Sequence, residues 1–146
     1  MKLKLVESKK EEIPIIAEIY KTEFSKPPYN EPWTIRKAVD KMRFFIKYYD
    51  LYTIKADKEI VGFICVNPLF MCPGEVAFGE ELAIKEEFQN KGIGTWTLKE
   101  IFEIYRKKGF KRFMGVLEEG ARVVSLYNRL NIKPSKKYKL IEKKLK

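Results

Sequence analysis

Residues 89–94 (QNKGIG) join an apolar segment, 75–84, to an amphipathic segment, 93–108. The first segment has the length and apolar character of a long strand. The second ends in a basic turn followed by Gly109, which suits the negative end of a helix dipole and a left-handed residue after the helix. The junction therefore predicts a strand that leads through a short glycine-bearing loop into a helix, whose apolar positions are Trp96, Leu98, Ile101, Phe102 and Tyr105.

Hydrophobic periodicity along the rest of the chain predicts a mixed sheet with helices on both faces. Ser8 and Glu11 have the spacing of a capping box, although Pro14 favours a regular helix that begins only near Glu12. Thr34 is expected to cap the second helix. The expected strands are residues 2–6, 51–55, 60–66, 75–84, 110–117 and 136–145. Four helices are expected: one that ends near Phe24, one that follows Thr34, and two that span 93–108 and 120–130.

The glycines of the 89–94 loop have a chemical interpretation. A helix N-terminus offers unpaired N–H groups and the positive end of the helix dipole, both of which favour phosphate. Gly92 and Gly94 remove Cβ atoms where the main chain must bend and approach a ligand closely, and Lys91 adds a cation. Neither GxxxxGK[ST] nor GxGxxG is present. The loop therefore predicts a diphosphate site of another kind, with an ordinary strand-to-helix turn as the alternative.

The chain contains no histidine, and this excludes several kinds of chemistry. Ser-His-Asp and Cys-His catalysis and HExxH zinc sites all require that side chain. Cys65 and Cys72 lack the pattern of a disulfide framework and are read as free thiols. Proton transfer must then use carboxylates, Tyr, Lys, Cys or water, and no metal is expected.

The net charge of +10 comes from 30 Lys and Arg against 20 Asp and Glu. Such a balance fits an anionic partner, such as nucleic acid or a phosphorylated cofactor, or a solvated Lys/Glu surface. No stretch approaches the roughly 20 apolar residues of a membrane helix, and the N-terminus lacks the apolar run of a signal peptide. We therefore expect the 146 residues to form one cytoplasmic domain without a membrane partner.

Two segments carry a resemblance to a known family. Residues 89–94 resemble the Q/R-x-x-G-x-G/A signature of the GNAT family of N-acetyltransferases, with a strand before it and an amphipathic helix after it. Residues 125–134 (SLYNRLNIKP) are similar to the family's second motif, usually LYEKLGF. The chain departs from the family at Asn131, Ile132 and Gly120, where Gly, Phe and Asn are usual. The order of elements resembles the family over essentially the whole chain.

The resemblance implies an α/β (α+β) fold with a mixed, mostly antiparallel sheet of six to seven strands and helices on both faces. It also implies acetyl-CoA as the acetyl donor. Tyr127 would lie near the coenzyme's sulfur and protonate the departing thiolate, although its helical spacing with Val123 and Leu130 also fits a core tyrosine. A backbone N–H near Ile84 would stabilise the thioester oxygen. The residues that the resemblance assigns to coenzyme A are Leu82, Ala83, Ile84, Gln89, Asn90, Lys91, Gly92, Ile93, Gly94, Thr95 and Tyr127.

The acceptor amine needs a base, because a lysine-type amine with a pKa of about 10.4 is protonated at neutral pH. The strand that precedes the loop offers Glu80 and Glu81, which alternation places on opposite faces. Glu80 is slightly preferred, acting directly or through water, but a bulge at Gly79 would reverse that preference. Solvated strand carboxylates are the alternative reading of both.

The acceptor site follows from the resemblance, which places it over the loop between the first two helices. This loop, residues 25–32 (SKPPYNEP), holds three prolines and cannot be helical. Aromatic rings beside carboxylates suit a cationic amine. The expected lining residues are Phe24, Tyr29, Asn30 and Trp33.

Together these features predict an N-acetyltransferase that moves an acetyl group from acetyl-CoA to a primary amine, in a small molecule or a protein, by direct transfer in a ternary complex. One alternative is a non-catalytic acyl-CoA sensor of the same fold. A basic nucleic-acid-binding protein is a further alternative, but no recognised binding motif is present. The chain is expected to act as a monomer or a homodimer.

Overall fold

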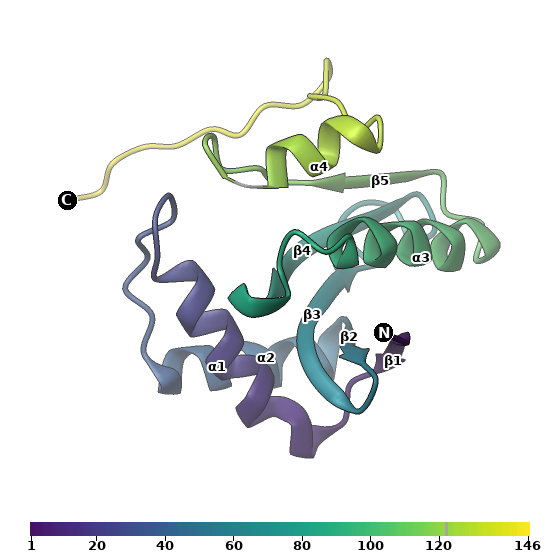
Figure 1. Ribbon diagram of the computed structural model, residues 1–146. Coiled ribbons are helices and arrows are strands. Elements are labelled where there is room, and N and C mark those ends of the chain that lie inside the picture. Colours follow the sequence, from purple (N-terminus) through teal and green to yellow (C-terminus); the bar gives the residue numbers. More distant parts are fainter. Residues whose placement is uncertain (122) are drawn as a thin grey trace.

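The computed structural model describes residues 1–121 and 123–146, arranged around one sheet (Figure 1). Short 3-10 turns at Lys10–Glu12 and Glu86–Phe88 precede α1 and α3. The strands are β1 Leu3–Glu7, β2 Asp50–Ala56, β3 Glu59–Asn67, β4 Val76–Ile84 and β5 Arg112–Gly115. The helices are α1 Ile13–Phe24, α2 Ile35–Tyr48, α3 Ile93–Lys107 and α4 Val123–Arg129.

The sheet is mixed and mostly antiparallel, as expected. Its strand order is β1-β2-β3-β4-β5, and only the β4–β5 pair is parallel. The structure shows five strands in the described residues, so the expectation of six to seven strands is wrong. The difference lies mainly at the C-terminus.

Residues 136–145 form no strand in the structure, contrary to the prediction. Leu140, Ile141 and Leu145 are 80%, 90% and 89% exposed. The adjacent Leu140 and Ile141 would point to opposite faces of a strand, so one of them would stay in water. The neighbouring edge is also short, because β5 has four residues, Arg112–Gly115, instead of the expected 110–117. Little apolar area is therefore available to order the tail.

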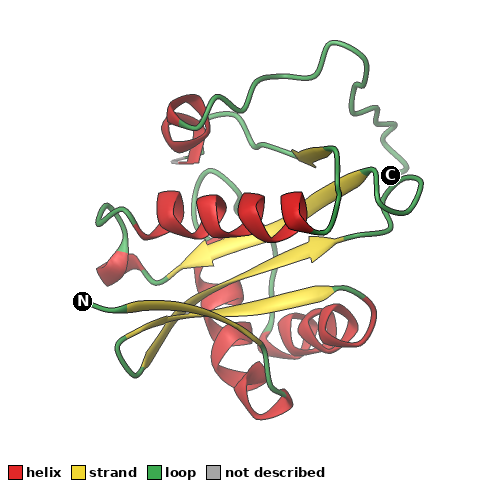
Figure 2. Ribbon diagram, turned by 90° about the vertical axis from the view of Figure 1, so that its right-hand side faces the viewer, coloured by secondary structure: helices red, strands yellow, loops and turns green. Residues whose placement is uncertain are grey.

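The helices cover both faces of the sheet (Figure 2), and the side chains of β3 divide between those faces. Phe63 and Cys65 are buried in the cluster that α1 and α2 form against the sheet. Ile64 and Val66, on alternate positions, are buried with residues of α3 on the other face. The period of two in β3 therefore gives the sheet two apolar faces, each of which needs a helical layer.

The entry to α1 differs in detail from the predicted capping box of Ser8 and Glu11, which is wrong. The Lys9 N–H donates to Glu12 Oε1 at 2.9 Å, and Ser8 Oγ lies 2.7 Å from Thr53 Oγ1 instead. The helix begins at Ile13, as Pro14 indicated. The predicted cap of α2 is confirmed, because the Lys37 N–H donates to Thr34 Oγ1 at 3.1 Å.

A bulge in β4 positions the functional site. Cys65 on β3 pairs with Glu81, but the next residue, Val66, pairs with Gly79, which leaves Glu80 as an extra residue. The bulge that Gly79 indicated is therefore present. β5 pairs with β4 only from Val76 to Gly79, so in the described residues the second half of β4 has no ladder partner on its β5 side. The two strands part at the bulge.

Candidate active site

A cleft of about 430 Å³ opens where β4 leaves β5. Residues of the end of β4, the start of α3, the loop after α1 and the helix α4 contribute to its lining. A volume of this order suits a cofactor-sized ligand. The residues that line it are Glu23, Phe24, Lys26, Pro27, Pro28, Tyr29, Leu82, Ala83, Ile84, Glu86, Phe88, Gln89, Asn90, Gly92, Ile93, Gly94, Thr95, Leu126 and Arg129.

The N-terminus of α3 presents free N–H groups to this cleft. Asn90 (φ 62°) and Gly92 (φ 82°) are both left-handed, and Gly92 is the N-cap residue. The Trp96 N–H is the first to return to the loop, donating to the Gly92 carbonyl at 3.0 Å. Over the described residues, the N–H groups of Gly94 and Thr95 have no backbone acceptor. Together with the helix dipole they can bind an anion.

The two loop glycines serve different purposes. A Cβ on Gly94 would lie 3.0 Å from Leu126 Cδ2 and 3.6 Å from Ile84 Cδ1, so Gly94 allows α4 to approach the end of β4. A Cβ on Gly92 would meet nothing within 4 Å, and its left-handed φ is the reason for glycine there. The open space in front of Gly92 leaves the main chain accessible to a ligand.

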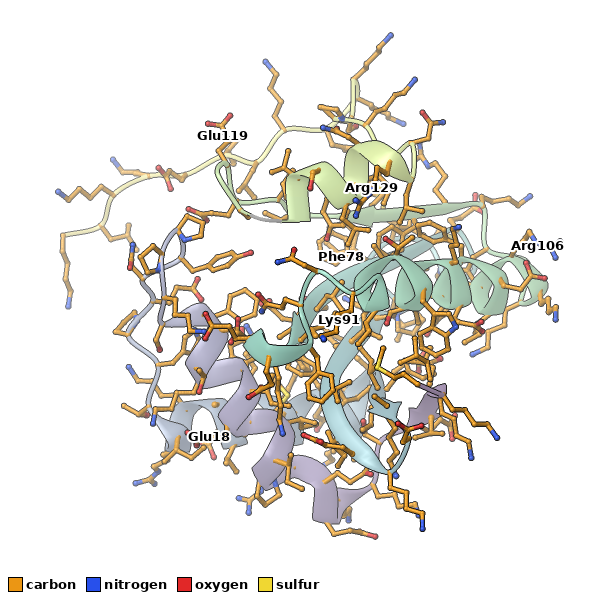
Figure 3. All side chains as sticks on the ribbon, viewed as in Figure 1. Glu18, Phe78, Lys91, Arg106, Glu119 and Arg129 are labelled. Carbon is orange, nitrogen blue, oxygen red and sulfur yellow. The ribbon has the colours of Figure 1, made fainter. Side chains whose placement is uncertain are left out.

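Most of the residues expected to bind coenzyme A line the cleft, but not all of them do. Gln89 lines the cleft, but its Nε2 donates to Ile84 O and to Glu23 Oε1, each at 2.7 Å, and so ties the loop to β4 and α1. Lys91 is exposed and is not part of the cleft lining. Arg129, which the sequence analysis missed, lines the cleft from α4 (Figure 3). The missed signal was a cation two positions after Tyr127 in the second motif.

Backbone direction in β4 also bears on the cleft. The Lys85 N–H donates to the Val61 carbonyl at 2.8 Å, so it points towards β3. Because N–H directions alternate along a strand, those of Leu82 and Ile84 point away from β3, towards the parting of β4 from β5. These amides can therefore donate to a ligand that lies along β4 as an added strand would.

A second, smaller cavity of about 60 Å³ adjoins the cleft and shares Phe24, Tyr29 and Leu82 with it. Its lining brings together Glu80, Glu81 and Tyr127. All three candidate catalytic side chains therefore lie around one space.

The two carboxylates of this cavity differ in environment. Glu81 accepts a hydrogen bond from Tyr20 Oη at 2.9 Å and lies 3.6 Å from Lys41 Nζ. Burial raises the pKa of Glu81 to about 7, against the opposing effect of Lys41. Glu80 Oε2 accepts from Asn67 Nδ2 at 3.2 Å. A carboxyl with a pKa near 7 changes its charge near neutral pH, as a general base for work at that pH requires.

Tyr127 remains protonated at neutral pH, because burial raises the pKa of its hydroxyl to about 12. A protonated hydroxyl can donate to a developing thiolate. The ring also packs against the α3-side core cluster, so the two interpretations of Tyr127 are compatible.

The expected acceptor residues separate into two groups. Phe24 and Tyr29 line both cavities. Trp33 lines neither: its Nε1 donates to Glu31 Oε1 at 2.8 Å, and its ring packs edge-on against Tyr20 at a centroid distance of 4.5 Å. Asn30 is exposed, with φ 50°, and is likewise outside both linings.

The described residues include no group of three or more Cys, Asp or Glu side chains arranged to hold a metal ion. Within the same residues, none of the helices has the length and apolarity to cross a membrane. Asn131 stands at the position where the resemblance leads us to expect glycine. Its φ of 60° is the left-handed conformation that favours glycine and that asparagine tolerates.

Residues 13–132 match the model of the acetyltransferase (GNAT) family. None of the curated proteins matches the sequence. Solved structures that share the fold include a possible acetyltransferase from Clostridium difficile 630, with TM-score 0.81 and 13% identity over 98% of this chain and 97% of that one. The aminoglycoside N-acetyltransferase AAC(6')-Iy in complex with CoA has TM-score 0.73 and 12% identity over 97% and 95%. The aminoglycoside acetyltransferase meta-AAC0020, from an uncultured soil metagenomic sample and in complex with sisomicin, has TM-score 0.68 and 15% identity over 99% and 95%.

Proposed function

The chain belongs to the acetyltransferase (GNAT) family, and on that premise we propose that it transfers an acetyl group from acetyl-CoA to a primary amine within a ternary complex. The observation that carries the proposal is the cleft, which the open N–H groups at the start of α3 face, together with the adjoining cavity that Glu81 and Tyr127 line. This arrangement matches a ligand with phosphates at one end and a reactive sulfur at the other.

The residues around the cleft fit coenzyme A. The N–H groups of Gly94 and Thr95, with the dipole of α3, would hold the diphosphate, and the Arg129 guanidinium adds a cation from the opposite side. The outward N–H groups of Leu82 and Ile84 would hold the amide-bearing arm. Bound acetyl-CoA supplies an acetyl group activated as a thioester.

The remaining chemistry falls to side chains of this chain. Glu81 takes a proton from the acceptor ammonium, directly or through water, so that the nitrogen gains a lone pair. A backbone N–H of β4 near Ile84 stabilises negative charge on the carbonyl oxygen as the amine attacks. As the C–S bond breaks, Tyr127 gives its proton to the departing sulfur, and the second proton that the attacking nitrogen loses returns to Tyr127 through water. Glu80, which accepts a hydrogen bond from Asn67, lines the same cavity but takes no proton in this scheme.

The acceptor is proposed to be a cationic amine. The Phe24 and Tyr29 rings lie 4.5 Å apart between centroids, beside the cavity that Glu80 and Glu81 line. Aromatic faces and carboxylates together attract an ammonium group. The same features suit a small polyamine, an aminoglycoside-like amine and a protein amine, so the acceptor class needs an experimental screen.

A thiol-release assay with acetyl-CoA and a panel of amines tests the proposal. We expect coenzyme A release that depends on both the protein and an amine, and the corresponding N-acetyl product by mass spectrometry. Binding of coenzyme A in a calorimeter without product from any amine would favour the acyl-CoA sensor. Strongly salt-dependent affinity for DNA or RNA, with no coenzyme binding, would favour the nucleic-acid binder.

Tyr127→Phe should slow turnover roughly 100-fold, the lower end of the usual effect of general acid catalysis. The affinity for coenzyme A should change little, because the ring and its packing in the core remain. Steady-state rates and calorimetry on the same preparation measure both. Unaltered turnover would make Tyr127 a core residue and leave another group as the acid.

A further inference from the structure

Lys41 on α2 carries an ammonium group held among aromatic rings. Its Nζ lies 5.3 Å from the ring centroid of Trp33 and 5.5 Å from those of Tyr20 and Phe45. The same Nζ lies 3.6 Å from Glu81 Oε1, and the Lys41 side chain is 36% exposed. Three rings from two helices and the loop between them therefore fix a cation beside the proposed base.

This arrangement differs from that of an ordinary surface lysine. Exposed ion pairs have little net effect because water screens them and long side chains remain mobile. Here the Glu81 side chain is only 20% exposed, and the rings restrict the lysine and replace part of its hydration. A charge held at this distance from a largely buried carboxylate acts strongly on it.

Tyr20 is the second group that contacts the Glu81 carboxylate. Its hydroxyl donates to Glu81 Oε1, the same oxygen that faces Lys41. Burial and the Glu81 carboxylate raise the pKa of Tyr20, so it stays a donor at every pH of interest. Tyr20 thus orients the carboxylate, whereas Lys41 acts on its charge.

We propose that Lys41 is a positioning residue for acetyl transfer: its caged ammonium lets Glu81 ionise near neutral pH, so that the carboxylate can take a proton from the acceptor. The inference rests on the proposed function, in which Glu81 is the base. Lys41 lines neither the cleft nor the cavity, so it acts through Glu81 without touching the substrates.

The groups that face Glu81 leave this task to Lys41. In the described structure, the charged and titratable groups around Glu81 include Tyr20, Tyr29, Glu31, Lys41, Cys65, Glu80 and Tyr127. Lys41 is the cation of this set. Burial and the nearby Glu31 and Glu80 favour the protonated form of Glu81, and Lys41 opposes them. Without Lys41, Glu81 would ionise only at a higher pH.

Lys41→Met tests the proposal, because methionine keeps the length of the side chain and removes the charge. We expect the pKa of Glu81, followed by carbon-13 NMR of the carboxyl groups in the full chain, to rise by about 1 to 3 pH units above that of the wild type. The acid limb of the kcat/KM profile should move up by the same amount. Lys41→Arg keeps the charge, so its Glu81 pKa and its acid limb should stay close to those of the wild type. The Kd of Lys41→Met for coenzyme A should stay within about twofold of the wild type, since no cleft contact is lost.

The outcomes separate this proposal from the function on which it rests. An unchanged Glu81 titration in a folded Lys41→Met protein would overturn it, as would a loss of activity without a shift of the acid limb. The titration needs no turnover, so a shifted pKa in a protein that acetylates no amine would refute the function, and the positioning role with it. Should Lys41→Met fail to fold, Trp33→Leu loosens the cage and should produce a smaller upward shift; no shift there would overturn the proposal equally.

Discussion

Glu81→Gln is expected to lower kcat/KM for acetyl transfer by about 100- to 10,000-fold at pH 8, the range that general base catalysis usually supplies. Glutamine keeps the shape of the side chain and can still accept from Tyr20, but it cannot take a proton from the acceptor. In the wild type, kcat/KM should fall below an apparent pKa of about 7, because burial raises the pKa of Glu81 to that value. The variant should lose this acid limb. Rates measured between pH 5.5 and 9 decide the matter.

Glu80→Gln is the matched control, one residue away on the same bulge. It removes a carboxylate of the same cavity but leaves Glu81 with its partners, so we expect less than a roughly tenfold loss. A larger loss in Glu80→Gln than in Glu81→Gln would make Glu80 the base. That outcome would restore the preference based on strand alternation alone.

Folding stability separates the loss of a base from the loss of structure. The pKa of Glu81 is raised on folding, so the folded state binds its proton more tightly than the unfolded chain does, and stability falls as the pH rises from about 4.5 to about 7. Above that range the ionised carboxylate costs the folded state on the order of 3 kcal/mol, since each pKa unit is about 1.4 kcal/mol. Glu81→Gln should therefore unfold at a denaturant concentration no lower than the wild type at pH 8.

The local chemistry of the sequence predicted the parts of this fold that depend on a few adjacent residues. Residues 89–94 predicted a turn into a helix, and this turn can form because Gly92 adopts φ 82° without strain. Thr34 capped α2 because a hydroxyl before an amphipathic run can accept from the first turn. The tail 136–145 was predicted wrongly, because alternation shows that a segment can form a strand but not that an edge long enough to pair with it exists.

The candidate site was predicted less completely, for a related reason. The bulge at Glu80 depends on how β4 pairs with Cys65 and Val66 on β3, and this register cannot be read from β4 alone. Tyr20 and Glu81 are 61 residues apart, so their hydrogen bond was also invisible in the sequence. Gly92, by contrast, was assigned its place from the motif. Long-range contacts decide how a carboxylate titrates, whereas local backbone geometry decides where a phosphate can bind.

Gly92→Glu should weaken coenzyme A binding by about 100-fold or more, because it affects the feature on which every later step depends. A carboxylate at the N-cap of α3 would accept from the free N–H groups of Gly94 and Thr95 and would repel the phosphates that need them. Losing two hydrogen bonds to charged groups, each about 1.5–3 kcal/mol, accounts for this change in affinity. Calorimetry with coenzyme A measures it directly.

Gly74→Glu is the control for Gly92→Glu, since Gly74 has φ +86° and the same open space around its Cβ but lies outside the cleft. Both variants carry the same new charge and a similar left-handed strain, on the order of 1–2 kcal/mol. Equal stability with affinity lost only in Gly92→Glu would locate the phosphates at α3. Gly92→Ala should reproduce the strain and keep most of the affinity. If Gly92→Glu bound coenzyme A as the wild type does, the diphosphate would have to bind elsewhere, and a transfer reaction centred on Glu81 and Tyr127 would lose its anchor.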